Sequence, residues 1–121
     1  MERIVIPDKI RSRNEIDKYN WAKKSRLKKT YQVLIRNQMR LNKLKECEVH
    51  DVFDLKIISY RTRQLDHDNL VGGSKQLIDA LCDECFIWDD SPKYLNNIEF
   101  KQISIKEMKD KTLIERVPVC K

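Results

Sequence analysis

Residues 65–75 read LDHDNLVGGSK, and this stretch joins two different sequence patterns. Before it, residues 49–63 (VHDVFDLKIISYRTR) are rich in β-forming residues, and apolar and polar side chains alternate from Phe53 to Ile57. After it, Leu77, Ile78 and Leu81 recur at the spacing of one helix face. The stretch therefore predicts a strand, a turn and a helix in direct succession. We expect Gly72 and Gly73 to allow that turn by adopting positive φ angles.

Acidic groups gather around this predicted turn. Asp66 and Asp68 lie two positions apart, and Lys75 falls on the first turn of the helix that follows. Asp89 and Asp90 come after the far end of that helix, and a return loop would bring them back toward the first pair. Carboxylates that converge at neutral pH repel one another unless a cation lies between them. Oxygen ligands favour Mg²⁺ or Mn²⁺ over zinc.

The rest of the chain predicts a single α+β domain spanning residues 1–121, with a small mixed sheet. Residues 4–6 form a short strand that ends at Pro7. Residues 14–45 contain neither Gly nor Pro and predict a long basic N-terminal helix, or two joined helices. A second helix follows the aspartate turn. Residues 97–105 and 112–119 predict two more strands, the last of them at an edge of the sheet.

The charge of the chain is unevenly distributed. The net charge is +6, but residues 1–46 hold 14 Lys and Arg against 5 Asp and Glu, whereas residues 47–121 hold 11 against 14. This division predicts a surface that faces a polyanion, beside a site built from carboxylates. We expect five residues to contact DNA phosphates: Lys23, Lys24, Lys28, Arg61 and Arg63. No signal peptide or membrane-spanning run appears, so we expect a cytoplasmic location and no membrane partner.

Two other metal sites are not supported by the sequence. Cys82 and Cys85 form a C-x-x-C, but no second pair at zinc-site spacing accompanies them, so we interpret them as two partly buried thiols at a helix end. A calcium-binding EF-hand that starts at Asp66 would need glycine at its sixth position and glutamate at its twelfth. Those places hold Val71 and Leu77.

The composite pattern LDHDNL…K…LIDAL…FIWDDSP, over residues 61–92, resembles the RusA family of Holliday-junction endonucleases. That family shows D-x-D-N followed by a lysine, a helix ending in D-A-L, and an aromatic segment closing on D-D. The resemblance is looser over the N-terminal strand and basic helix. The segment 71–74 is longer here than in the best-known member, and Cys85 stands where glycine is common.

The resemblance implies a homodimer that cuts four-way DNA junctions by paired symmetric hydrolysis, in a bacterial or phage-infected cell. It also implies that Mg²⁺ is the cofactor, with Mn²⁺ as a possible substitute, and that no small-molecule cofactor is used. By position, Asp66, Asp68 and Asp90 match its metal-binding aspartates, and Lys75 matches its catalytic lysine. Asn69 and Asp89 match supporting residues, Asn69 as a brace of the loop through hydrogen bonds.

Other interpretations remain open. The same chemistry would serve a nuclease of flaps or other branched DNA, because the motif determines chemistry better than substrate shape. A basic nucleic-acid-binding protein without catalytic activity would explain the lysine-rich helix but would leave the aspartates without a role. Taken alone, Asp66 and Asp68 are ordinary turn formers, and Lys75 is an ordinary solvated lysine.

Overall fold

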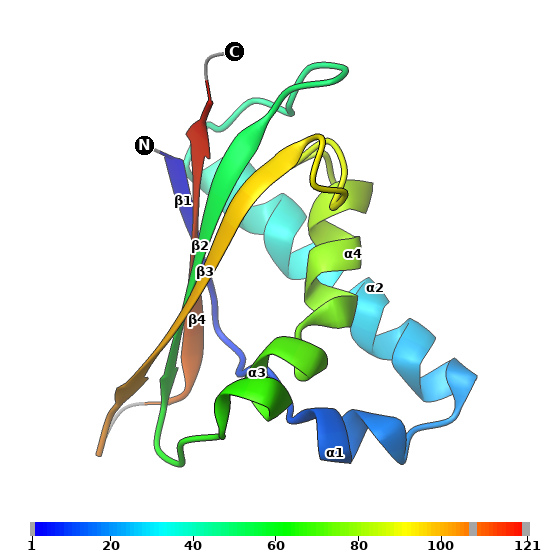
Figure 1. Ribbon diagram of the computed structural model, residues 1–121, viewed down its shortest axis with the longest axis vertical. Coiled ribbons are helices and arrows are strands. Elements are labelled where there is room, and N and C mark those ends of the chain that lie inside the picture. Colours follow the sequence, from blue (N-terminus) through cyan, green and yellow to red (C-terminus); the bar gives the residue numbers. More distant parts are fainter. Residues whose placement is uncertain (1, 107–108, 120–121) are drawn as a thin grey trace.

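The computed structural model describes residues 2–106 and 109–119. Its four-stranded mixed sheet has the order β1–β4–β2–β3, and the helices lie on one side of it (Figure 1). The expected single α+β domain is confirmed in this form. The strands are β1 (Glu2–Ile6), β2 (Phe53–Arg61), β3 (Leu95–Ser104) and β4 (Lys111–Pro118), and the helices are α1 (Arg13–Asp17), α2 (Trp21–Leu41), α3 (His67–Gly73) and α4 (Lys75–Asp83).

Helix α2 packs on the sheet through one apolar stripe. Asn20 caps its N-terminus by accepting a hydrogen bond from the Lys23 N–H, which satisfies one of the unpaired amides of the first turn. Its buried residues recur every four positions: Leu27, Tyr31, Ile35 and Met39. The basic residues lie between them on the remaining faces. No helix within the described residues combines the length and the apolar character that crossing a membrane requires.

The pairing of β2 with β3 determines where the segment that connects them begins and ends. Strand β2 runs parallel to β3, with Phe53 paired to Leu95 and Arg61 paired to Ser104. A parallel pair needs a crossover connection, and α3 and α4 supply it. The chain therefore leaves β2 at one end of the sheet and enters β3 at the other (Figure 1).

Strand β4 is central rather than at an edge, contrary to the sequence prediction. It pairs with β1 on one side and with β2 on the other, both in antiparallel orientation. Pro118 is compatible with this place because it is the last residue of the strand, where one missing donor does not interrupt the ladder. The free edges of the sheet belong to β1 and β3.

The glycine pair serves close packing, and the predicted positive φ angles are wrong. Neither Gly72 nor Gly73 has a positive φ, and both lie inside α3. A Cβ atom on Gly73 would stand 1.8 Å from the Arg11 carbonyl oxygen. A Cβ atom on Gly72 would stand 2.5 Å from the Arg13 Cδ atom, in a flexible side chain. Glycine at 73 is therefore required by the approach of α3 to the backbone of the N-terminal segment.

The two glycines predict opposite outcomes for the same substitution. Gly73→Ala places a methyl group against a backbone carbonyl, so we expect the free energy of unfolding to fall by about 2 kcal/mol or more. Gly72→Ala displaces only a side chain and adds helix propensity, so we expect a change within about 1 kcal/mol. Urea denaturation followed by circular dichroism measures both values. Equal losses in the two variants would contradict this account of the packing.

Candidate active site

Asp66 caps helix α3, so the D-x-D-N motif starts a helix rather than lying in a loop. One oxygen of the Asp66 carboxylate accepts the Asn69 backbone N–H at 2.9 Å, and the other accepts the Asn69 side-chain amide at 2.8 Å. The Asn69 side-chain oxygen in turn accepts the Asn14 backbone N–H at 3.2 Å. Asn69 thus holds Asp66 and ties α3 to α1 through these hydrogen bonds.

These hydrogen bonds also set the protonation of Asp66. The Asn69 backbone N–H, followed by the Asn69 side-chain amide, lowers the pKa of the Asp66 carboxyl group below its ordinary value. Asp68 follows on the first turn of α3 and is exposed. The lowered pKa therefore favours the charged form of the Asp66 carboxylate at the exposed N-terminus of α3, with Asp68 two residues further along the same first turn.

Arg61 does not have the DNA-binding role expected of it. Its side chain is buried, with 5% of the residue exposed. Its guanidinium donates to the Arg63 carbonyl at 2.6 Å and to the Ile10 carbonyl at 2.7 Å. Arg61 therefore joins the end of β2 to the N-terminal segment and is not available to a phosphate. Arg63 is exposed.

Lys75 and Asp90 line one pocket between α4 and β3. The pocket has a volume of about 350 Å³, and its walls are otherwise mostly apolar. Asp79 lies in the same pocket, one helical turn after Lys75. Burial raises the pKa of Asp79, and the nearby Asp90 charge acts in the same direction while Lys75 opposes it. The charges of Lys75 and Asp90 therefore both act on the Asp79 carboxyl group.

Asp79 is a site residue that the sequence prediction missed. The signal was present, because residues four apart on a helix share one face and Asp79 follows Lys75 at that spacing. Asp89, the expected supporting residue, is half-buried. Together with Asp90, it raises the pKa of the Cys82 thiol, after the larger effect of burial.

The Asp66–Asp68 pair is not brought together with Asp90 in one chain. The pair follows the end of β2, whereas Asp90 precedes β3 at the opposite end of the crossover (Figure 1). Across residues 2–106 and 109–119, no group of three His, Cys, Asp or Glu side chains is close enough to hold a metal ion. The carboxylate donors suit Mg²⁺ by their chemistry, but their arrangement in a single chain does not.

A contact through His67 links the two parts of the site. The His67 ring meets the Phe100 ring edge-on, with 6.5 Å between centroids. Phe100 also lines the pocket of Lys75 and Asp90. His67, which lies between Asp66 and Asp68 in the sequence, therefore contacts one residue of the pocket, although neither aspartate lines it.

The basic residues expected to contact DNA differ in their surroundings. Lys24 lines a pocket with Arg13 and Lys75, which extends the charge of the site onto α2. Lys28 pairs with Asp83 at 3.2 Å, and the Lys23 ammonium lies 4.1 Å from the centre of the Tyr19 ring.

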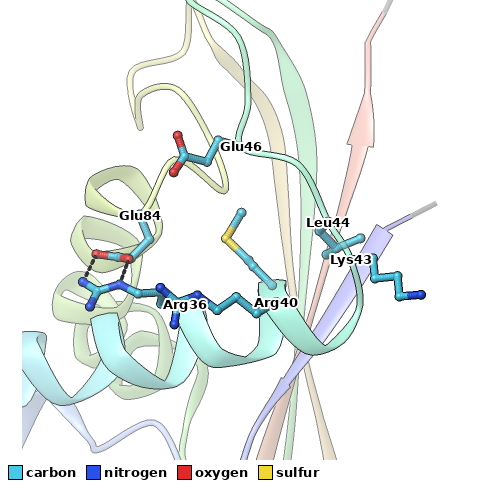
Figure 2. A pocket seen from close by; sticks show the side chains of 7 residues that line it. Arg36, Arg40, Lys43, Leu44, Glu46 and Glu84 are labelled. Carbon is cyan, nitrogen blue, oxygen red and sulfur yellow. Dashed lines mark hydrogen bonds and ion pairs between the residues drawn. The ribbon is translucent and has the colours of Figure 1, made fainter.

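A further basic group lies toward the other end of α2. Arg40 and Lys43 line a pocket there with Arg36, whose guanidinium binds both oxygens of Glu84 (Figure 2).

Comparison with known proteins gives no assignment for this chain: no family model matches it, and no curated protein sequence matches it significantly.

The Asn69 brace predicts a change in the titration of Asp66. Asn69→Ala removes the side-chain donor but keeps the backbone donor, so we expect the pKa of Asp66 to rise toward its ordinary value without reaching it. A depressed folded pKa contributes stability above the unfolded pKa of a carboxyl group, and this stability is lost as the pH falls through the folded value. Carboxyl ¹³C NMR titration measures the shift. An unchanged Asp66 pKa in the variant would contradict the brace.

Proposed function

We propose that this protein is a metal-dependent endonuclease that cuts four-way DNA junctions as a homodimer. Two lines of evidence support the proposal. The first is the resemblance of residues 61–92 to the RusA family. The second is the pocket in which Lys75 and Asp90, 15 residues apart in sequence, lie with Asp79. That shared pocket is the observation that carries the proposal, because it places an ammonium group beside carboxylates on an accessible surface.

Two copies of the chain would complete the acidic site that one copy leaves divided. Strand β3 lies at an edge of the sheet, with its outer side unpaired by the strands of the described residues. An edge strand can extend the sheet by pairing with a second chain. Suppose that two β3 strands pair in antiparallel orientation about a two-fold axis. The start of β3 in one copy, which follows Asp90, then lies beside the end of β3 in the other copy, which is close to Asp66.

The sequence of β3 suits such pairing with itself. With the axis at Phe100, Glu99 lies opposite Lys101 of the partner subunit, and opposite charges across paired strands are favourable. Ile98 then lies opposite Gln102 of the partner subunit. Within one chain Ile98 lines the Asp90 pocket, and the Gln102 amide donates to the Leu65 carbonyl, next to Asp66. This pairing would therefore bring Asp90 of one copy toward the Asp66–Asp68 pair of the other.

The residues of the composite site would have distinct roles. Asp66 and Asp68 from one copy and Asp90 from the other would hold Mg²⁺ or Mn²⁺. When bound, the ion polarises the scissile phosphate and lowers the pKa of a water molecule. Lys75 would stabilise negative charge on the phosphate oxygens by donating hydrogen bonds. Asp79, one turn away on α4, would attract the Lys75 ammonium group and hold it in place.

A dimer also matches the symmetry of the substrate. A four-way junction is cut on two opposing strands, and two copies related by a two-fold axis supply two equivalent sites. Lys24, Arg13 and the exposed Arg63 would contact phosphates near each site without reading sequence. Binding of this kind weakens steeply as the salt concentration rises.

One observation favours a second candidate function. Because the carboxylates are divided within a single chain, a basic nucleic-acid-binding protein without catalytic activity also agrees with the fold. The two functions differ in their need for Asp66, Asp68 and Asp90: hydrolysis needs all three carboxylates, whereas phosphate binding gains from their removal, since each repels DNA.

Cleavage of labelled DNA tests the proposal. The full chain is incubated with four-way, flap and linear duplex DNA, with Mg²⁺ or with EDTA. We expect paired symmetric nicks on the four-way substrate in Mg²⁺ alone. The variants Asp66→Asn, Asp68→Asn and Asp90→Asn should each lower the rate by about 100-fold or more, because each removes an ion ligand.

Asp54→Asn is the matched control, because Asp54 lies on the sheet face opposite the helices, and it should retain the wild-type rate. Flap-specific cutting would redirect the proposal to another branched substrate. Binding that is indifferent to EDTA and is strengthened in the three variants, with no cutting, would overturn it in favour of the second candidate.

A further inference from the structure

Cys47 and Cys85 lie side by side although they are 38 positions apart in the sequence. The Cys47 backbone N–H donates to the Cys85 carbonyl at 2.7 Å. The Cys85 thiol also interacts with the Cys47 side chain. Residues that exchange backbone hydrogen bonds in an antiparallel sheet have Cα atoms about 5.5 Å apart, and a disulfide spans Cα separations of about 4.4–6.8 Å, so a backbone hydrogen bond is compatible with a bridge.

A buried arginine holds the two cysteine-bearing segments against each other. Arg116 is 2% exposed and stacks over the Phe86 and Phe53 rings. Its guanidinium donates to the Phe86 carbonyl at 2.7 Å and also to the Lys45 carbonyl. These acceptors lie one residue after Cys85 and two residues before Cys47. The approach of the two thiols is therefore fixed by the core and is not a contact between mobile loops.

Cys85 occupies a backbone conformation that favours glycine. Its φ angle is +59°, immediately after the end of α4. Glycine takes this left-handed position at helix ends most readily, because a Cβ atom disfavours it in other residues. Cys85 therefore occupies a position where glycine would be more favourable for the backbone. This observation is independent of the contact with Cys47.

Cys82 is the less favourable partner for Cys85. Asp83 acts on both thiols, but the other charges near Cys82 are those of Asp90, Asp89 and Asp79, whereas the other charges near Cys85 are those of Glu46 and Glu84. The two side chains therefore leave the end of α4 toward different surroundings. Glu46 and Glu84 lie near each other beside the Arg36 pocket (Figure 2).

We propose that Cys47 and Cys85 form a reversible intramolecular disulfide in the presence of a low-molecular-weight disulfide oxidant. One cysteine thiolate attacks the oxidant, forming a mixed disulfide and releasing one small thiol. The second cysteine thiolate attacks the mixed disulfide, forming the Cys47–Cys85 bond and releasing a second small thiol. The protein loses two protons and two electrons, and the oxidant gains them.

The surroundings of the two thiols affect the rate at which the disulfide forms. Burial raises the pKa of Cys47 to about 11, and burial and nearby acids raise that of Cys85. Because the thiolate is the attacking form, the raised pKa values slow the reaction of the pair with the oxidant. Once formed, the bond would tie the segment after α2 to the segment that leads into Asp89 and Asp90.

Oxidised glutathione tests the proposal on the full chain. After equilibration, remaining thiols are alkylated and the chain is digested and mapped by mass spectrometry. We expect a peptide pair joined through residues 47 and 85, and a rise in Tm of about 5 °C or more, because the bond closes a long loop in the unfolded chain. The control Cys82→Ser/Cys120→Ser should keep both results.

Two variants keep the test informative. Cys85→Gly, which relieves the left-handed backbone, should fold and lose both the bridge and the oxidation-dependent rise in Tm, as should Cys47→Ser. The proposal is overturned if residues 47 and 85 stay unbridged in the wild-type chain, or if Cys85 pairs with Cys82 instead. This result is independent of nuclease activity, so it can fail or succeed whatever the DNA cleavage assay shows.

Discussion

The contact between Gly73 and the Arg11 carbonyl is the constraint on which the rest of the candidate site depends. It lets α3 lie directly on the segment that enters α1, where any side chain at residue 73 would collide with backbone. Two polar contacts fix the same junction: the Asn69 side chain with the Asn14 N–H, and the Arg61 guanidinium with the Ile10 carbonyl. The N-terminal segment therefore acts as a support that positions the first acidic pair.

From this support the charged groups extend along β3. The Asp66–Asp68 pair lies near Phe100 through His67, Lys75 begins α4, and Asp90 stands toward the start of the strand. The parallel pairing of β2 and β3 imposes this order, since the crossover must run the length of both strands. This arrangement separates the Asp66–Asp68 pair from Asp90 within one chain. In the proposed dimer, antiparallel pairing of two β3 strands would bring the pair of one copy toward Asp90 of the other.

Much of the fold followed from local sequence patterns. The alternation in β2 identified the strand, and its odd-numbered residues, from Phe53 to Arg61, face the helices. That alternation also contained the information that Arg61 points inward, although its charge led us to place it on the DNA-binding surface. The D-x-D-N segment was expected to be a turn because the capping role of Asp66 was not recognised. Aspartate is a preferred N-cap residue, and its side chain here accepts the backbone N–H of Asn69, three positions later.

Other features depended on contacts between distant residues and could not be predicted from the sequence. Nothing near Gly73 indicates that a carbonyl from residue 11 lies against it. The central place of β4 depends on pairing with β1, more than 100 residues away in the chain. The Lys75–Asp79 spacing did carry a signal, but its importance depended on Asp90 reaching the same pocket.

The most direct test of a shared site is a mixture of two inactive variants. Asp66→Asn and Asp90→Asn are each purified, then combined under conditions that allow subunits to exchange, and assayed on the four-way junction with Mg²⁺. If each site takes Asp66 from one copy and Asp90 from the other, a mixed dimer contains one intact site, and single-strand nicking should return. If each site lies within one chain, every site in the mixture lacks a carboxylate, and continued inactivity of a demonstrated mixed dimer would contradict the account.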